Sequence, residues 1–376
     1  MIMKSLEDYI VPWVRASETY SDKHMDFAWS HPEIVRMMSN ENLLPPSKAV
    51  MDAVLEAARL GNLYPGSSEQ LRKRLAEKEG LEPDQVILGN GSTDVINFTI
   101  NTFVAPGEEV IIPVPTFSMY EARLRFHGGM PVLVPLTPAP NFYWDIPAIL
   151  AAVTDKTRLI VVCSPNNPTG NQIAEADLRC LLETGIPVFI DEAYYELEDV
   201  PRSWAYLIKE YPNTLVSRTM SKAYGLAGFR VGYVYASPEI ASYLNRVRFP
   251  WNVSLVAIAA ALAALDDEED QRLKRNNTLE GRQQLMDDIN RIPGLRAYPS
   301  EGNFVLFDAS ILEKTSTQIR DDIIARGIFI RPMSPHHMKE GYVRVTVGTP
   351  EQNRRFIQVL NDYVNECLGL SSLTMK

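Results

Sequence analysis

Short apolar segments recur along residues 86–235, and helical stretches separate most of them. The segments are 86–88, 109–114, 130–134, 157–162, 187–190, 214–216 and 231–235. Buried strands that alternate with helices in this way form a mostly parallel sheet whose two faces are both covered. The pattern therefore predicts an α/β fold built on such a sheet.

After residue 256 the sequence no longer alternates between apolar strands and helices. An alanine-rich helix is expected over 257–265, and a long amphipathic helix over 271–292. The acidic run 266–270 suits the positive end of the second helix, so it is interpreted as a solvated helix start. Short strands and helices follow up to residue 367.

Length and composition allow two domains. A chain of 376 residues, 45% of them hydrophobic, can bury two cores. Residues 46–265 are expected to form the large domain. Residues 266–376 are expected to form a smaller α/β domain together with residues 1–45, which show little periodic structure.

The net charge and the cysteine content limit the kinds of partner and site that the chain can have. The net charge of −10 argues against nucleic acid or an anionic membrane surface as the main partner. Three scattered cysteines, Cys163, Cys180 and Cys367, suit neither a disulfide framework nor a metal site. No apolar run approaches the roughly 18 residues of a membrane helix, so we expect a soluble cytoplasmic protein.

The five histidines lie at none of the motifs considered below. Adjacent His336 and His337 could bind a metal in principle, but neighbouring side chains in a polar loop point apart. No metal site is therefore expected.

The segment 214–235 holds a reactive combination of residues between two apolar strands. Thr219, Ser221, Lys222 and Arg230 lie within twelve residues of each other. A lysine enclosed by apolar walls can lose its proton and act as a nucleophile, and the neighbouring hydroxyls and arginine suit a phosphate. A lysine and an arginine on a solvated loop are the alternative.

Other polar groups follow the remaining strands. In open α/β sheets ligands bind at the carboxyl ends of the strands, where Phe117, Asn167, Asp191 and Lys222 all fall. The segment 89–94, GNGSTD, joins a strand to a helix start that can bind phosphate through free N–H groups. It matches neither GxGxxG nor a P-loop, and an ordinary turn is the alternative.

These side chains together suit pyridoxal 5′-phosphate. That cofactor needs a lysine for a Schiff base, a carboxylate at the pyridine nitrogen and donors to the ring oxygen. Lys222, Asp191, Tyr194 and Asn167 can supply these groups, and Phe117 offers a flat apolar face.

The chain resembles the fold-type-I, pyridoxal-phosphate-dependent aminotransferases of class I/II, and within them it is most similar to the histidinol-phosphate aminotransferases. Motifs over residues 39–349 carry the resemblance: NEN (40–42), YPG (64–66), GNGSTD (89–94), PTFSMY (115–120), SPNNPTG (164–170), DEAYYE (191–196), RTMSKAYGLAGFRVGY (218–233), GIFIRP (327–332) and YVRVTVGT (342–349). The combination is specific, although each motif alone is weak. The resemblance implies a large domain with a mostly parallel sheet and a smaller α/β domain.

The resemblance also implies a role for each matching residue. Lys222 would bind the cofactor covalently and act as general base, with Asp191 at the pyridinium nitrogen. Asn167 and Tyr194 would bond the phenolic oxygen, and Phe117 would stack on the ring. The phosphate would be held by Ser92, Thr93, Thr219, Ser221 and Arg230, and by Tyr64 of the neighbouring subunit in a homodimer.

The substrate site is implied by a second set of residues. Arg344 would bind the anionic end of the substrate, and Arg331 would line the pocket. Asn42, in the NEN motif, and Trp13, where the family often has a tyrosine, would complete it. The alternative for both arginines is pairing with surface carboxylates.

Three departures from the family pattern bear on the substrate. Leu43-Leu44-Pro45-Pro46 makes one wall more apolar, and Trp13 and Phe117 lack the hydroxyl of the usual tyrosine. The resemblance implies ping-pong transfer of an amino group to 2-oxoglutarate, as in histidine biosynthesis. Transfer from aromatic or other amino acids, a lyase resembling threonine-phosphate decarboxylase, and a cofactor-binding scaffold are the alternatives.

Overall fold

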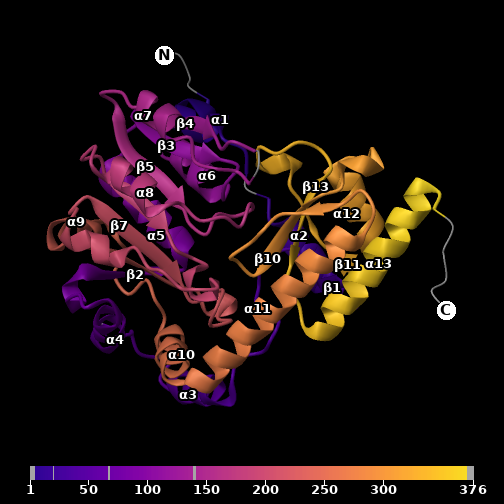
Figure 1. Cartoon of the computed structure of the whole chain (residues 1–376). Helices are drawn as coiled ribbons and strands as arrows, with labels where there is room; N and C mark the ends of the chain where they lie inside the picture. Colours follow the sequence, from indigo (N-terminus) through magenta and orange to yellow (C-terminus); the bar gives the residue numbers. More distant parts are fainter. Residues whose placement is uncertain (1–4, 20, 67, 139–140, 371–376) are drawn as a thin grey trace.

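The structure is a computed structural model that describes residues 5–19, 21–66, 68–138 and 141–370 (Figure 1). Its largest element is a seven-stranded sheet in the order β2-β8-β7-β6-β5-β3-β4. The strands are β2 (Val86–Asn90), β3 (Glu109–Val114), β4 (Met130–Pro135), β5 (Thr157–Cys163), β6 (Val188–Asp191), β7 (Thr214–Thr219) and β8 (Val231–Ala236). These correspond to the apolar segments of the sequence.

Strand direction brings the polar loops to one edge of the sheet. β3, β4, β5, β6 and β7 pair in parallel, whereas β8 runs antiparallel to β2 and β7. The prediction of a mostly parallel α/β sheet is therefore confirmed. Because β2 has the same direction as β7, the loop after β2 reaches the same edge as the loops after β3, β5, β6 and β7.

Helices cover both faces of this sheet (Figure 1). Successive strand residues alternate between faces, so Ile111 packs into one core while Val110 and Ile112 pack into the other. One face is covered by α5 (Ser92–Phe103), α6 (Met119–Phe126) and α9 (Pro238–Val247). The other is covered by α3 (Lys48–Ala58), α4 (Glu69–Glu79), α7 (Ile146–Ala151), α8 (Glu175–Leu182) and α10 (Leu255–Asp266).

A second hydrophobic core lies beside the first. Its sheet has the order β12-β13-β10-β9, and it packs against three helices. The elements are β9 (Arg296–Ala297), β10 (Phe304–Asp308), β12 (Arg331–Pro332), β13 (Tyr342–Thr346), α11 (Glu268–Arg291), α12 (Ser316–Ile324) and α13 (Pro350–Leu368). We propose that this core marks the smaller domain, with boundaries near residues 45 and 266.

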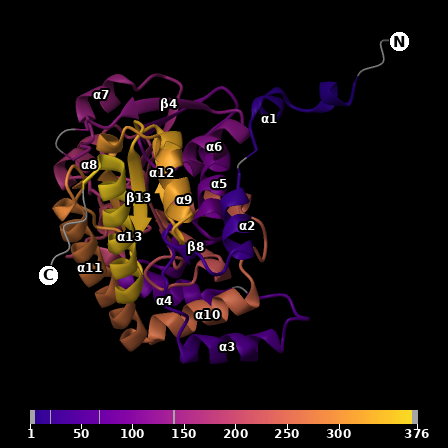
Figure 2. The ribbon, with the colours of Figure 1, turned by 90° about the vertical axis from the view of Figure 1, so that its right-hand side faces the viewer.

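The N-terminal segment is more ordered than its sequence indicates. It forms α1 (Pro12–Ala16), α2 (Lys23–Ser30) and β1 (Val35–Arg36), which pairs in parallel with β11 (Ile328–Phe329). The two helices are short and bury little apolar surface, so no periodic pattern marks them. Figure 2 shows α1 at the outer edge of the molecule, near α6.

Side-chain caps fix several helix starts. Ser47 accepts a hydrogen bond from the Val50 N–H at 3.3 Å, as expected for the N-cap of α3. Asp267 accepts from the Asp270 N–H at 3.1 Å at the start of α11, which confirms that the acidic run is a helix start. The neighbouring short strands β11 and β12 belong to two different sheets.

Short 3-10 helices connect several of these elements: η1 (Leu6–Tyr9), η2 (Pro83–Gln85), η3 (Tyr195–Leu197), η4 (Ala205–Lys209), η5 (Ala227–Phe229), η6 (Ser310–Leu312) and η7 (Ser334–His336). Within the described ranges, none of the helices has the length and apolar character needed to cross a membrane.

Candidate active site

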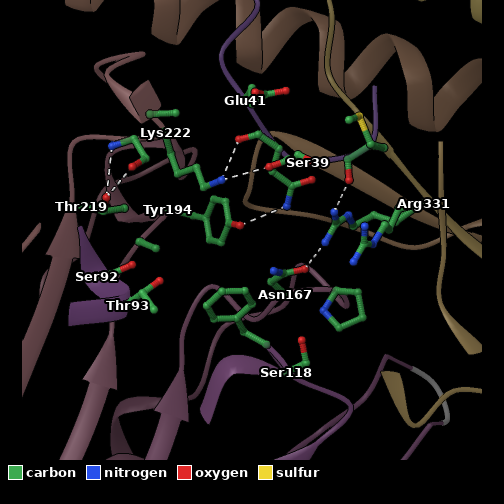
Figure 3. Close-up of a pocket in the computed structure, with 18 of the residues that line it drawn as sticks. Ser39, Glu41, Ser92, Thr93, Ser118, Asn167, Tyr194, Thr219, Lys222 and Arg331 are labelled. Carbon is green, nitrogen blue, oxygen red and sulfur yellow. Dashed lines mark hydrogen bonds between the residues drawn. The ribbon is translucent and has the colours of Figure 1, made fainter. Parts of the chain in front are cut away.

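A cavity of about 450 Å³ opens at the carboxyl edge of the large sheet. Three parts of the chain enclose it: the loops of the large sheet, residues 24–41 of the N-terminal segment, and residues of β12, η7 and β13 (Figure 3). Of the residues singled out in the sequence, the cavity brings together Ser92, Thr93, Phe117, Asn167, Asp191, Tyr194, Thr219, Ser221, Lys222, Arg230, Arg331 and Arg344.

The amine of Lys222 lies inside this cavity. Its Nζ donates hydrogen bonds to the carbonyl oxygens of Ser39 (3.2 Å) and Asn40 (2.9 Å) (Figure 3). Burial, with Arg344 nearby, lowers the pKa of Lys222 to about 8. The amine therefore loses its proton more readily than a solvated lysine and becomes a better nucleophile. The alternative interpretation, in which this lysine lies on a solvated surface loop, is therefore excluded.

Asp191 ends β6 and is only 2% exposed. Its Oδ2 accepts a hydrogen bond from the Tyr120 hydroxyl at 2.6 Å, and its Oδ1 accepts one from the Ala193 N–H at 3.1 Å. Burial raises the pKa of Asp191 to about 6, and these hydrogen bonds oppose the rise. A cation placed beside Asp191 would therefore stabilise its ionised form and lower its pKa.

Tyr120 was not selected from the sequence, although it lies in the same PTFSMY motif as Phe117. It is the second residue of α6, and its ring meets that of Phe117 edge-on at 5.6 Å. A buried carboxylate needs hydrogen-bond donors, and this requirement indicates that some donor must lie near Asp191. The sequence alone could not show which hydroxyl approaches Asp191.

Tyr194 and Asn167 enter the cavity from the loops after β6 and β5. The Tyr194 hydroxyl accepts a hydrogen bond from Asn40 Nδ2 at 3.0 Å, and its ring centroid is 5.8 Å from Lys222 Nζ. The Asn167 amide oxygen accepts a hydrogen bond from Arg344. Burial raises the pKa of Tyr194, so its hydroxyl stays protonated and can donate.

Hydroxyls, a helix start and a guanidinium converge at one end of the cavity. Ser92 and Thr93 begin α5, while Thr219 donates to the Ser221 hydroxyl at 2.9 Å. Arg230 has a left-handed backbone (φ 59°), and its guanidinium lies against Gly91. A Cβ at Gly91 would be 2.2 Å from Arg230 Nη2, so this approach requires glycine.

Arg331 and Arg344 are directly opposite each other in the β12–β13 pair. Arg344 is 7% exposed and donates to the Met38 carbonyl oxygen at 2.7 Å as well as to Asn167. It therefore forms part of the cavity wall and is not a surface ion pair. Arg331 lines the same wall (Figure 3).

Two histidines are placed differently from what the sequence indicated. His24 on α2 and His336 in η7 both line the cavity. Burial and Arg331 lower the pKa of His24 to about 4 and that of His336 to about 3. His337 points elsewhere, with its Nε2 2.9 Å from Glu121. Among the described residues no group of three or more possible metal ligands is present.

Three predicted site residues do not line the cavity within one chain. Tyr64 is 81% exposed and packs on Trp251, with ring centroids 4.9 Å apart. Trp13 lies against Gly128. Asn42 donates to the Lys222 carbonyl oxygen at 3.4 Å, so it contacts the backbone of the lysine segment. The roles of these three residues stay predictions.

The chemistry of this cavity fits pyridoxal 5′-phosphate. The Lys222 amine, the buried Asp191 carboxylate and the aromatic rings of Phe117 and Tyr194 all line the same cavity. The hydroxyls of Ser92, Thr93, Thr219 and Ser221, with Arg230, form a pocket for an anion. The donors required for ring, ring oxygen and phosphate are therefore all present.

Comparison with known proteins agrees with this chemistry. The family model described as aminotransferase class I and II matches residues 32–360. The histidinol-phosphate aminotransferase of Symbiobacterium thermophilum is 40% identical over 338 residues, which cover 89% of this chain and 91% of that protein. Histidinol-phosphate aminotransferase 2 of Carboxydothermus hydrogenoformans is 39% identical and covers 96% and 98% of the two chains.

A solved structure adds the cofactor. Histidinol-phosphate aminotransferase from Sinorhizobium meliloti, in complex with pyridoxal-5′-phosphate, has a TM-score of 0.84 to this chain at 25% identity, covering 95% of this chain and 98% of that one. The fold and site thus define a pyridoxal-phosphate enzyme of fold type I. The chain belongs to the aminotransferase class I and II family, and it is an aminotransferase with pyridoxal 5′-phosphate as cofactor.

Proposed function

We propose that this enzyme transfers the amino group of histidinol phosphate to 2-oxoglutarate by a ping-pong mechanism. The observation that carries the proposal is the cationic wall of the cavity: Arg331 and Arg344, paired across β12 and β13, both line the cavity that holds the lysine and the carboxylate. A donor with an anionic group suits this wall. The names of the relatives at about 40% identity point to the same donor.

Lys222 and Asp191 are proposed to act on the reacting atoms. When bound, pyridoxal 5′-phosphate supplies an aldehyde that condenses with amines and a ring that withdraws electrons. Lys222 Nζ, with its lowered pKa, would hold the cofactor through the aldehyde carbon and, once the substrate amine had displaced it, would take the proton from the substrate Cα. Asp191, oriented by Tyr120, would keep the ring nitrogen protonated.

Other residues are proposed to orient the cofactor. Asn167 and Tyr194 would donate hydrogen bonds to the ring oxygen, and Phe117 would stack on the ring face. The residues that would hold the phosphate are Ser92, Thr93, Thr219, Ser221 and Arg230, with the start of α5. A ring fixed in this way would orient the substrate toward the Lys222 amine.

The substrate is proposed to bind between the arginines and the N-terminal segment. Arg344 holds its anionic end, and Arg331 lines the pocket. Asn42 supports the lysine segment through its hydrogen bond to the Lys222 carbonyl oxygen. Trp13 is assigned a substrate contact by family resemblance alone.

The active unit is proposed to be a homodimer, with Tyr64 reaching the cofactor phosphate of the other subunit. Supporting this, Tyr64 (81% exposed) and Trp251 (61% exposed) stack on each other at the surface, close in sequence to exposed Leu63 and Phe249. Large exposed aromatic groups that cluster in this way are typical of protein interfaces.

A spectral donor screen tests the proposed reaction. Holoenzyme is mixed with histidinol phosphate, phenylalanine, tyrosine, leucine or threonine phosphate, and the cofactor absorption is followed in a single turnover. Histidinol phosphate should convert the cofactor to its amine form with the highest kcat/KM, and 2-oxoglutarate should reverse the change. A faster reaction with phenylalanine or leucine would contradict the donor assignment, and release of carbon dioxide would indicate a lyase.

A further inference from the structure

The end of the cavity next to Arg331 carries two histidines that the proposed mechanism does not use. His24 comes from α2 and His336 from η7, segments more than three hundred residues apart in the chain. Both side chains are half-buried and both line the cavity with Arg331 and Arg344. A substrate group that reaches Arg331 therefore also meets these imidazoles.

The charges around the two rings favour their neutral forms. His24 faces Arg331 and Arg344, with Asp22 as the nearby carboxylate. His336 faces the same arginines together with His337 and His24. Arg36 and Glu41 also line the cavity and pair with each other at 2.8 Å. Without a bound anion, burial and the arginines hold both histidines uncharged at neutral pH.

We propose that His24 and His336 recognise the phosphate group of the donor by taking up a proton as it binds. The inference rests on the proposed function, because it requires a phosphorylated donor. A neutral imidazole offers one N–H donor, whereas a protonated one offers two and a positive charge. The site thereby distinguishes a dianionic phosphate ester from a carboxylate or another single charge.

The charge of the ligand decides whether the proton is taken up. An opposite charge within about 4–6 Å favours the protonated form of histidine, and a phosphate monoester carries nearly two negative charges above its second pKa of about 6. Since binding raises the pKa of the histidines, the affinity for the phosphate must fall as pH rises through their pKa in the complex. A ligand with a single negative charge raises the pKa of the histidines by about half as much.

Calorimetry with two ligands of the same shape tests the proposal. Holoenzyme is titrated with 3-phenylpropyl phosphate and with 3-phenylpropyl sulfate, which cannot react because they lack an amine. Titrations at pH 7.5 in buffers of different ionisation enthalpy give the protons exchanged on binding. We expect the phosphate ester to bind with uptake of about a quarter of a proton, and its Kd to rise about twofold between pH 7 and pH 8. The sulfate ester should show little uptake. Equal uptake for both esters, or none for the phosphate, would overturn the proposal.

Asparagine variants identify the groups that titrate. His24→Asn and His336→Asn keep a polar side chain that does not titrate, so each should lower the proton uptake, and the double variant should abolish it. His127→Asn is the matched control: burial also lowers the pKa of His127, but its Nε2 lies 3.2 Å from Asn97 Oδ1, and it does not line the cavity. Undiminished uptake in a folded double variant would contradict the assignment.

The proposed function and this inference can fail separately. If histidinol phosphate converts the cofactor but the phosphate ester binds without proton uptake, the aminotransferase proposal stands and the histidine proposal falls. If histidinol phosphate does not react and the phosphate ester binds no better than the sulfate ester, both proposals fall.

Discussion

Asp191 is a carboxylate that the fold stabilises poorly on its own. It is 2% exposed, and the hydroxyl of Tyr120 and the Ala193 N–H only partly replace water around it. Burial raises its pKa to about 6, from 3.8 in the unfolded chain. A group whose pKa is higher in the folded state stabilises the fold below its unfolded pKa, and this contribution disappears as pH rises through the folded pKa.

The first prediction concerns Asp191→Asn in the absence of cofactor. Removing the buried charge should make the variant more stable than the wild type at pH 8, by up to about 3 kcal/mol from the two pKa values, and the difference should vanish near pH 4. Thermal unfolding of both apoproteins across this range measures it. Added cofactor should stabilise the wild type more, because its ring nitrogen then pairs with the carboxylate. A variant less stable than wild type at pH 8 would refute this account of the carboxylate.

Gly91 gives the second prediction at this scale. In Gly91→Ala the new Cβ would be 2.2 Å from Arg230 Nη2, at a residue whose φ is 76°. The guanidinium must move away, so we expect a rise in the cofactor Kd of tenfold or more, about 1.4 kcal/mol. Fluorescence titration of the apoprotein measures it. Gly107→Ala is the control, since its φ is 85° but no atom lies within 4 Å of the added Cβ. Equal losses in both variants would indicate backbone strain in place of the clash.

At the scale of the element, β7 carries a buried ion cluster just before the lysine. Arg218 is fully buried and contacts Glu192 (2.9 Å) and Glu79 (2.7 Å), and its guanidinium carbon lies 3.8 Å from the Tyr195 ring centroid. These contacts join β7 to α4 and to the loop that follows β6. The strand end that presents Thr219 and Lys222 is therefore held from behind by charge as well as by apolar packing.

The third prediction is that Arg218→Met strongly destabilises the fold. The substitution fills part of the same space with an apolar side chain but leaves Glu192 buried without its cation. We expect this to lower the free energy of unfolding by about 3–5 kcal/mol. Urea unfolding measures the change. Lys48→Ala is the control, because the Lys48–Asp52 pair is largely exposed and should contribute less than about 0.5 kcal/mol. A loss below 1 kcal/mol in Arg218→Met would show that the cluster contributes little to stability.

The elements also show which features the sequence can reveal. The apolar runs predicted β2 to β8, because a buried strand needs a continuous apolar segment whatever its neighbours are. Because the strands before them run in parallel, Lys222, Asp191 and Asn167 could then be predicted to lie at one edge of the sheet. Tyr120, His24 and His336 were missed because their role depends on tertiary packing: α2 and η7 approach the cavity only in the folded chain. Short, exposed α1 and α2 leave no periodic signal.

For the whole molecule, the fourth prediction is complementation between two inactive proteins. Tyr64→Ala removes the phosphate contact proposed to cross the dimer, and Lys222→Ala removes the amine. A mixed dimer has one site with Lys222 from one subunit and Tyr64 from the other, so mixing and refolding should restore up to a quarter of the wild-type activity per subunit. Steady-state assays of the refolded mixture, with each variant refolded alone as control, measure it. No gain on mixing would contradict the proposal that Tyr64 completes the site of the other subunit.

The most direct test of the account is to locate the lysine that binds the cofactor. Holoenzyme is reduced with borohydride, which makes the bond between lysine and cofactor permanent, and its peptides are then sequenced by mass spectrometry. We expect the modified residue to be Lys222, whose amine lies inside the cavity. Modification of a different lysine, such as buried Lys274 on α11, or no modified peptide at all, would contradict it.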